Sequence, residues 1–169
     1  MRTLANLVAF QLGWFAAVLG AAHGMPWLGV IVVPPVLLLN MILSDDWKRE
    51  LHLALAAAAM GFVFDSTMTA LGAFAPVPYV FPPPFSPLWM VMLWINQATT
   101  LNGCLAWLRG RYLLGAIFGA IGGPFAYLGG AKLGAAAIPS TNQLLMLAAA
   151  WTLAFPALLR VAHKRSPQN

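Results

Sequence analysis

The chain has 169 residues, of which 61% are hydrophobic and 8% carry a formal charge, and its net charge is +5. A soluble domain carries about 25% charged residues, so this composition excludes an ordinary soluble fold. The uncharged runs 3–44 and 66–108 lack the alternation of polar and apolar residues that marks a membrane β-barrel strand. They predict an all-α, polytopic membrane protein.

Helix-breaking residues divide the chain into about six spanning helices, which form one compact membrane-embedded domain over residues 1–169. A spanning helix needs roughly 20 mostly apolar residues. In chain order, helices are expected at 4–22, 27–43, 51–74, 88–108, 112–131 and 144–161.

Prolines and an apolar extension predict irregularities in this pattern. The second helix contains Pro34-Pro35, two residues without a backbone N–H, and is expected to kink or break there. Six prolines between residues 75 and 87 predict a non-helical segment that lies on the outer end of the bundle. The apolar stretch continues past the fifth helix, so its extension to residue 138 remains an alternative.

Basic residues fall mostly on one side of the predicted bundle. Only Lys132 lies on the other side. The eight on the side of the termini are Arg2, Lys48, Arg49, Arg109, Arg111, Arg160, Lys164 and Arg165. Loops rich in lysine and arginine stay in the cytoplasm, so both termini are expected there. The positive charge is therefore assigned to topology, and no nucleic acid partner is predicted.

Asp65 is the most informative polar residue because it lies within the third apolar helix. An ionised acid deep in a bilayer costs roughly 2.5–3.5 kcal/mol on insertion scales. Asp65 is therefore expected to face the bundle interior or water, or to be protonated. The preferred reading is functional, namely a proton, cation or ligand site or an acid in a reaction. The alternative is a neutral acid that bonds helices together.

Other polar residues are predicted at a similar depth. Asn96 and Gln97 of the fourth helix and Gln11 of the first are expected within roughly 5 Å of the depth of Asp65. Thr100 shares one helix face with Asn96. These residues are expected to form a polar layer around Asp65. The alternative is interhelical hydrogen bonding worth roughly 0.6 kcal/mol per bond, and for Gln97 that alternative is preferred.

Lys132 is a further candidate for the site. If the fifth helix extends past it, its amine could pair with Asp65, which would reduce the cost of both charges. The preferred alternative is that its side chain extends outward to water.

A glycine stripe marks the fifth helix. Gly115, Gly119 and Gly123 recur every four residues and predict close packing against another helix. The single cysteine, Cys104, and the three dispersed histidines predict no metal or cofactor site.

Several motifs occur together along nearly the whole chain. They are Asn6, Gln11 and Trp14; Asp65 between Gly61 and Gly72; Pro87-x-Trp89; Leu93-Trp94; Thr100-Leu101-Asn102; Trp107; Gly122-Gly123-Pro124-x-Ala126-Tyr127; and Gly130-Ala131-Lys132-Leu133-Gly134. This pattern resembles the bacterial inner-membrane family catalogued as domain of unknown function 2878. The resemblance implies no particular activity. Genes for fatty-acyl-modifying methyltransferases and flavin oxidoreductases that neighbour family members imply a link to envelope lipid metabolism.

Three functions are compatible with these features. The first is binding or transport of a small or lipid-like ligand with Asp65 at its polar centre; size and helix count are similar to the substrate-binding subunits of energy-coupling-factor transporters. The second is an intramembrane enzyme or accessory subunit in lipid modification. The third is a structural partner of another membrane protein. Catalysis is less favoured, because no second acid or histidine accompanies Asp65.

Overall fold

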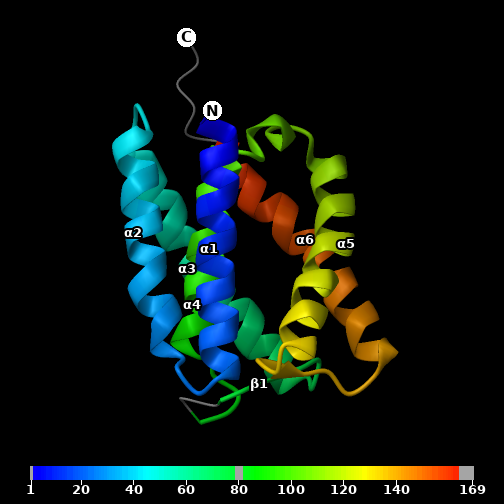
Figure 1. Cartoon of the computed structure of the whole chain (residues 1–169). Helices are drawn as coiled ribbons and strands as arrows, with labels where there is room; N and C mark the ends of the chain where they lie inside the picture. Colours follow the sequence, from blue (N-terminus) through cyan, green and yellow to red (C-terminus); the bar gives the residue numbers. More distant parts are fainter. Residues whose placement is uncertain (1, 79–81, 164–169) are drawn as a thin grey trace.

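The computed structural model describes residues 2–78 and 82–163, which form an up-and-down helical bundle (Figure 1). In chain order the elements are α1 (Arg2–Ala22), α2 (Trp27–Leu43), α3 (Trp47–Ala70), β1 (Ala75–Pro76), α4 (Leu88–Leu101), the short 3-10 helix η1 (Ala106–Leu108), α5 (Tyr112–Lys132), β2 (Ala136–Ala137) and α6 (Thr141–His163). The predicted all-α bundle is confirmed; a pair of two-residue strands is the one addition among the described residues.

The helices pack as two groups. α1 packs on α2 and α4, and α3 packs on α4, while α5 pairs chiefly with α6. α6 then contacts α3 and α4 and joins the two groups. α1 and α5 face each other across the front of the bundle in Figure 1 but pack mainly on other helices.

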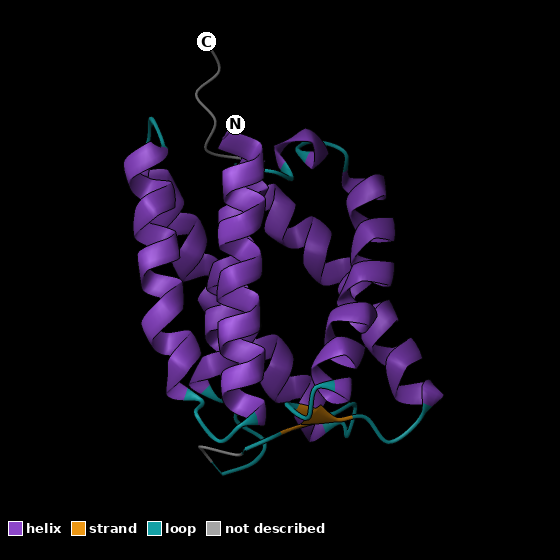
Figure 2. Ribbon diagram, in the orientation of Figure 1, coloured by secondary structure: helices purple, strands orange, loops and turns teal. Residues whose placement is uncertain are grey.

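The two strands close the end of the bundle opposite the start of α1, where Figure 2 shows them in orange. Ala75 pairs with Ala137 in antiparallel register, and the N–H of Val77 donates to the carbonyl of Ala135 at 2.8 Å. The proposed extension of the fifth helix to residue 138 is therefore wrong. Gly134, just after α5, adopts a φ of +94° and turns the chain into β2. Residues with a Cβ disfavour this positive φ, whereas glycine adopts it readily.

Two boundaries of α3 differ from the prediction of 51–74. The helix begins at Trp47 because the Asp46 carboxylate accepts a hydrogen bond from the N–H of Arg49 at 3.1 Å and caps the first turn. It ends at Ala70 because Gly72, with φ +71°, reverses the chain. α6 is longer than predicted at both ends.

The proline-containing segments behave differently from one another. α2 continues without interruption through Pro34 and Pro35, so the predicted break is absent. The segment 75–87 is non-helical wherever the structure describes it, as predicted, and residues 79–81 of that segment lie outside the described residues.

α4 ends at Leu101 rather than at the predicted residue 108, and η1 follows after a turn. The cause is Asn6 of α1. Its Nδ2 donates to the carbonyl of Thr99 at 3.0 Å, and its Oδ1 accepts the N–H of Cys104 at 2.9 Å. These bonds replace partners that backbone groups lose where a helix ends.

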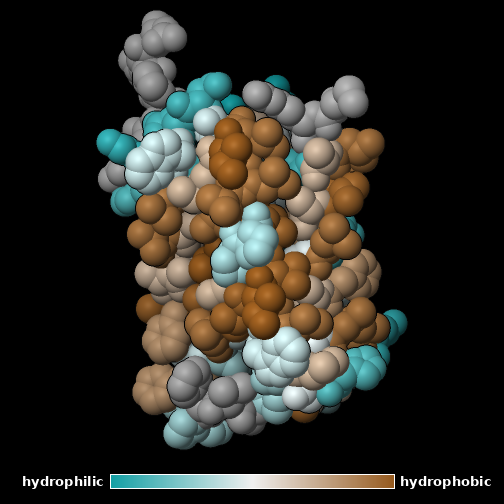
Figure 3. Space-filling view, turned by 60° about the vertical axis from the view of Figure 1, so that its left-hand side comes forward, coloured by the Kyte–Doolittle hydropathy of each residue, from teal (hydrophilic) through white to brown (hydrophobic). Residues whose placement is uncertain are grey.

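The outer surface of the bundle is apolar. Figure 3 shows mostly hydrophobic residues over the middle of one face, interrupted by one hydrophilic patch at its centre, with further hydrophilic residues towards both ends. Leu113, Leu153 and Ile42 are 77%, 75% and 70% exposed, which a soluble monomer rarely tolerates over a large patch. α1, α3, α5 and α6 are long and apolar enough to cross a membrane, and α2 is a shorter apolar helix. These features are those of a membrane protein.

Candidate functional site

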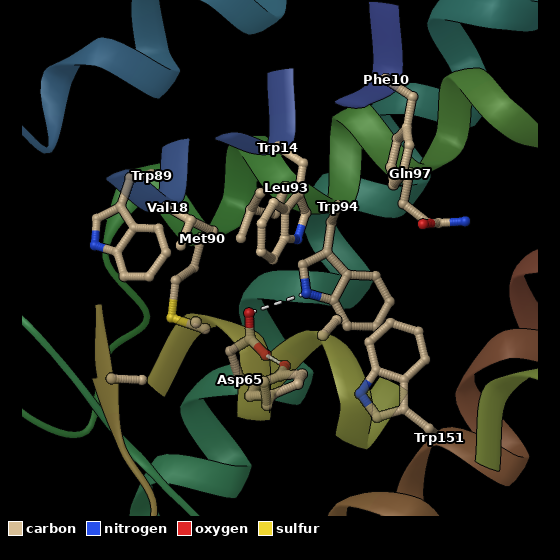
Figure 4. Close-up of a pocket in the computed structure, with 14 residues that line it drawn as sticks. Phe10, Trp14, Val18, Asp65, Trp89, Met90, Leu93, Trp94, Gln97 and Trp151 are labelled. Carbon is tan, nitrogen blue, oxygen red and sulfur yellow. Dashed lines mark hydrogen bonds between the residues drawn. The ribbon is translucent and has the colours of Figure 1, made fainter. Parts of the chain in front are cut away.

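The carboxylate of Asp65 is completely buried at the meeting point of three helices. Its Oδ2 accepts a hydrogen bond from the indole Nε1 of Trp94 on α4 at 2.9 Å, drawn in Figure 4. Its Oδ1 is hydrogen-bonded to the hydroxyl of Tyr127 on α5. Asp65 is 0% exposed, so the prediction that it faces the interior is confirmed.

A stack of two indoles positions Trp94. The rings of Trp94 and Trp151 lie 4.7 Å apart and within 12° of parallel. Gly61 of α3 packs on Trp94, and Gly123 of α5 packs on Trp151; a Cβ at either glycine would run into the indole. Glycine at these two places therefore lets four helices close on the stack, and the indole edge of Trp94 reaches Asp65.

A cavity of about 110 Å³ lies beside the carboxylate, and we call it the Asp65 cavity. Its walls come from α1, α3, α4, α5, α6 and β2, and they consist mainly of aromatic and aliphatic side chains. They include Phe10, Trp14, Trp89, Trp94, Tyr127 and Trp151. Asp65 is the single charged residue among those that line it.

A second cavity of about 420 Å³, which we call the lateral cleft, lies between the two helix groups. It shares Phe10, Trp14, Gln97, Ala126 and Trp151 with the Asp65 cavity, so the two spaces adjoin. Exposed side chains from α1 and α5 line its mouth. These are Leu7, Gln11, Phe118 and Phe125.

The other predicted polar residues divide between two places. Gln11 and Thr100 line the lateral cleft. Asn96 is fully buried, and its Nδ2 donates to the carbonyl of Phe10 at 2.8 Å, so it bonds α4 to α1. The residue assigned to packing, Gln97, lines both cavities and donates from Nε2 to Thr100 Oγ1 at 3.0 Å.

Lys132 does not join Asp65 in the structure. It is the last residue of α5 and its side chain is exposed. The partners of the Asp65 carboxylate are Trp94 and Tyr127. The hypothesis of a buried acid–amine pair is therefore wrong here, and the outward position of Lys132 matches the preferred alternative.

The glycine stripe lies against α6 within the same chain. Gly115 faces Leu159, and Gly119 faces the backbone of Trp151. Gly123 completes the stripe on the indole stack. Because this face is buried, it is not free to join another membrane protein.

Sequence reasoning missed the aromatic residues that surround Asp65. Trp94 and Trp151 lie in the middle of their helices, whereas tryptophan is usually enriched at the membrane interfaces. These mid-helix positions were the sequence signal that could have identified the two residues as part of the site. Buried indole N–H groups of Trp89 and Trp151 have no hydrogen-bond partner. In Figure 4 the nitrogen of Trp151 lies on the ring edge towards Asp65, and that of Trp89 points away.

A separate polar cluster lies near the start of α1, around a cavity of about 540 Å³. The buried carboxylate of Glu50 accepts hydrogen bonds from Ser44 and Asn102. Arg49 donates to Asn102 at 2.9 Å and to the carbonyl of Ala162 at 2.8 Å. These contacts join the ends of α3, α4 and α6. Among the described residues, no group of three or more His, Cys, Asp or Glu side chains could hold a metal ion.

Comparison with known proteins gives a family. The model of the family described as "Protein of unknown function (DUF2878)" matches residues 3–157. No curated protein and no solved structure matches the chain.

Proposed function

The chain belongs to the family of proteins of unknown function DUF2878, and we propose that it is a multi-pass inner-membrane protein that binds and carries an amphiphilic ligand. The observation that carries this proposal is a fully buried carboxylate, that of Asp65, beside an aromatic cavity that adjoins a lateral cleft. The ligand's polar headgroup occupies the Asp65 cavity, and its apolar body occupies the cleft.

Several features support membrane insertion with six crossings. α1 begins and α6 ends at the same end of the bundle (Figure 1), as an even number of crossings requires. Lys48, Arg49 and Arg109 lie at that end, in or beside the connections between helices, and loops rich in such residues stay in the cytoplasm. These features support a cytoplasmic location for both termini.

The energetics of the site support a ligand. Acidic residues inside membrane segments are costly and mark pathways or binding sites. A polar headgroup with hydrogen-bond donors would offset the cost of the buried Asp65 carboxylate. The lateral cleft, at about 420 Å³, falls in the range of about 300–1,000 Å³ that is usual for ligand sites.

Molecules that co-purify with the protein provide the test. The protein is purified in mild detergent, and its bound small molecules are extracted and identified by mass spectrometry. Ala126 lines both cavities, so Ala126→Phe is expected to displace the ligand. Ala59→Phe, on an exposed site of α3, is the matched control and should retain it.

Two results would contradict the proposal. One is a wild-type protein that carries no amphiphile above the background extracted from the detergent buffer alone. The other is an Ala126→Phe protein that carries the same molecules, in the same amount, as wild type. Metabolite and lipid profiles of a deletion strain beside an Asp65→Asn strain would then identify the affected compound class in cells.

A further inference from the structure

Resting on the proposed function, we infer that the headgroup bound at Asp65 is a protonated amine, with the carboxylate as its counter-ion. In the part of the chain that the structure describes, no basic side chain forms an ion pair with Asp65; its two partners are an indole and a phenol. Lys132, the basic residue that the sequence suggested as a partner of Asp65, is exposed at the end of α5.

The hydrogen bonds of the carboxylate leave some of its lone pairs without a partner. Each Asp65 oxygen takes part in one hydrogen bond, with Trp94 at Oδ2 and Tyr127 at Oδ1. An ionised carboxylate can accept about four. The Trp94 indole can only donate, so Oδ2 is an acceptor in this arrangement. An ammonium group would bring the donors and the positive charge that the site lacks.

The same features exclude other headgroups. A carboxylate or phosphate headgroup would bring a like charge next to Asp65 in a low-dielectric setting, which is unfavourable. A neutral alcohol would leave an ionised Asp65 without a counter-charge, and an uncompensated buried charge costs several kcal/mol. A small hydrated cation is disfavoured because it would lose its water shell to aromatic and aliphatic walls, which offer few oxygen ligands. An amine on an apolar chain meets both conditions, because the chain fits the adjoining cleft.

Three probes with one chain length test the inference: octylammonium, octan-1-ol and octanoate. Each is titrated at pH 7 into wild type, Asp65→Asn and Asp45→Asn in the same detergent, and bound ligand is counted by native mass spectrometry. Asp45 is exposed near the start of α1. It lines the separate polar cavity there but neither the Asp65 cavity nor the lateral cleft, so Asp45→Asn controls for the loss of one negative charge. Intrinsic tryptophan fluorescence gives a second reading in solution.

Wild type and Asp45→Asn are expected to bind octylammonium about tenfold more tightly than octan-1-ol, a difference of about 1.4 kcal/mol, and octanoate least. Asp65→Asn should lose that preference while it still binds octan-1-ol. Equal binding of the three probes by wild type, or an unchanged preference in Asp65→Asn, overturns the amine inference and leaves ligand binding intact. Failure of all three to bind any variant saturably, together with no co-purified amphiphile, overturns the proposed function as well.

Discussion

Two neutral donors hold the carboxylate of Asp65, and one of them comes from a helix far along the chain. Trp94 is fixed by its stack on Trp151, so its N–H has little freedom to move away. Tyr127 is fixed by edge contact with Phe74 at 4.8 Å between ring centroids. The partners of Asp65 are therefore held in place by their own contacts, which would reduce the ordering cost of binding the proposed ligand.

Tyr127→Phe removes one of these donors and leaves the shape of the side chain almost unchanged. A buried acceptor that loses a partner costs about 1–3 kcal/mol, so the variant is expected to unfold at lower temperature in detergent. In an Asp65→Asn background the loss should be smaller, since the bond then lacks a charged partner. Tyr112→Phe, at the opposite end of α5, is the control. Additive effects of the two substitutions would show that Tyr127 and Asp65 do not act together.

Gly123 is expected to tolerate no side chain. A Cβ there would meet the indole of Trp151, whereas a Cβ at the neighbouring Gly122 finds its nearest atom, in Phe118, at 3.8 Å. Gly123→Ala should cost about 1–3 kcal/mol from overpacking and change the near-ultraviolet circular dichroism of the stacked indoles. Gly122→Ala should leave both the spectrum and the unfolding temperature close to wild type. Equal behaviour of the two variants would contradict the packing described here.

The sequence was sufficient to predict the burial of Asp65 but not its partners. The burial could be inferred from Asp65 alone, because an acid within an apolar membrane helix almost always faces the bundle interior or a water-filled cavity. Trp94 and Tyr127 come from two other helices, and hydrophobic periodicity does not define how strongly apolar helices rotate against each other. Asn96 shows the same limit. Its depth suggested that it lies beside Asp65, but its amide donates to the carbonyl of Phe10.

At the scale of elements, Asn6 shows how a contact between distant segments sets a helix end. Its side chain bonds to Asn40 of α2 at 2.8 Å as well as to Thr99 and Cys104. The apolar run continues to residue 108, so local sequence predicted a longer α4. The six helices themselves were predictable from apolar runs, whereas this end depends on a residue 93 positions earlier.

Asn6→Ala is expected to loosen the turn after α4. Both the carbonyl of Thr99 and the N–H of Cys104 would lose their partner in a mostly buried place, at about 1–3 kcal/mol for each unsatisfied group. Cys104 is the only cysteine, so its rate of reaction with a maleimide reports directly on this turn and should rise. Asn142→Ala, at an exposed position early in α6, is the control. An unchanged labelling rate in Asn6→Ala would contradict the capping role.

At the scale of the whole molecule, the arrangement of charge predicts the orientation in the membrane. Lys48, Arg49, Arg109 and Arg160 lie near the end of the bundle where α1 begins, and Lys132 lies at the other end. The basic residues at 164 and 165 lie outside the described residues. The asymmetry predicts that the β1–β2 end lies outside the cytoplasm.

Reporter fusions test this orientation, and α4 is the decisive element. It has 14 residues, or about 21 Å at 1.5 Å per residue, which is short against a hydrocarbon core of about 30 Å. It can cross because the turn and η1 continue the chain beyond its end. A periplasm-specific phosphatase should be active after Pro84 and after Ser140, and inactive after Trp47, after Gly110 and at the C-terminus. Green fluorescent protein fluoresces in the cytoplasm but not after it has been exported in an unfolded state, so it should give the reverse pattern. Phosphatase activity after Gly110 would mean that α4 does not cross, and the model of six crossings would fail.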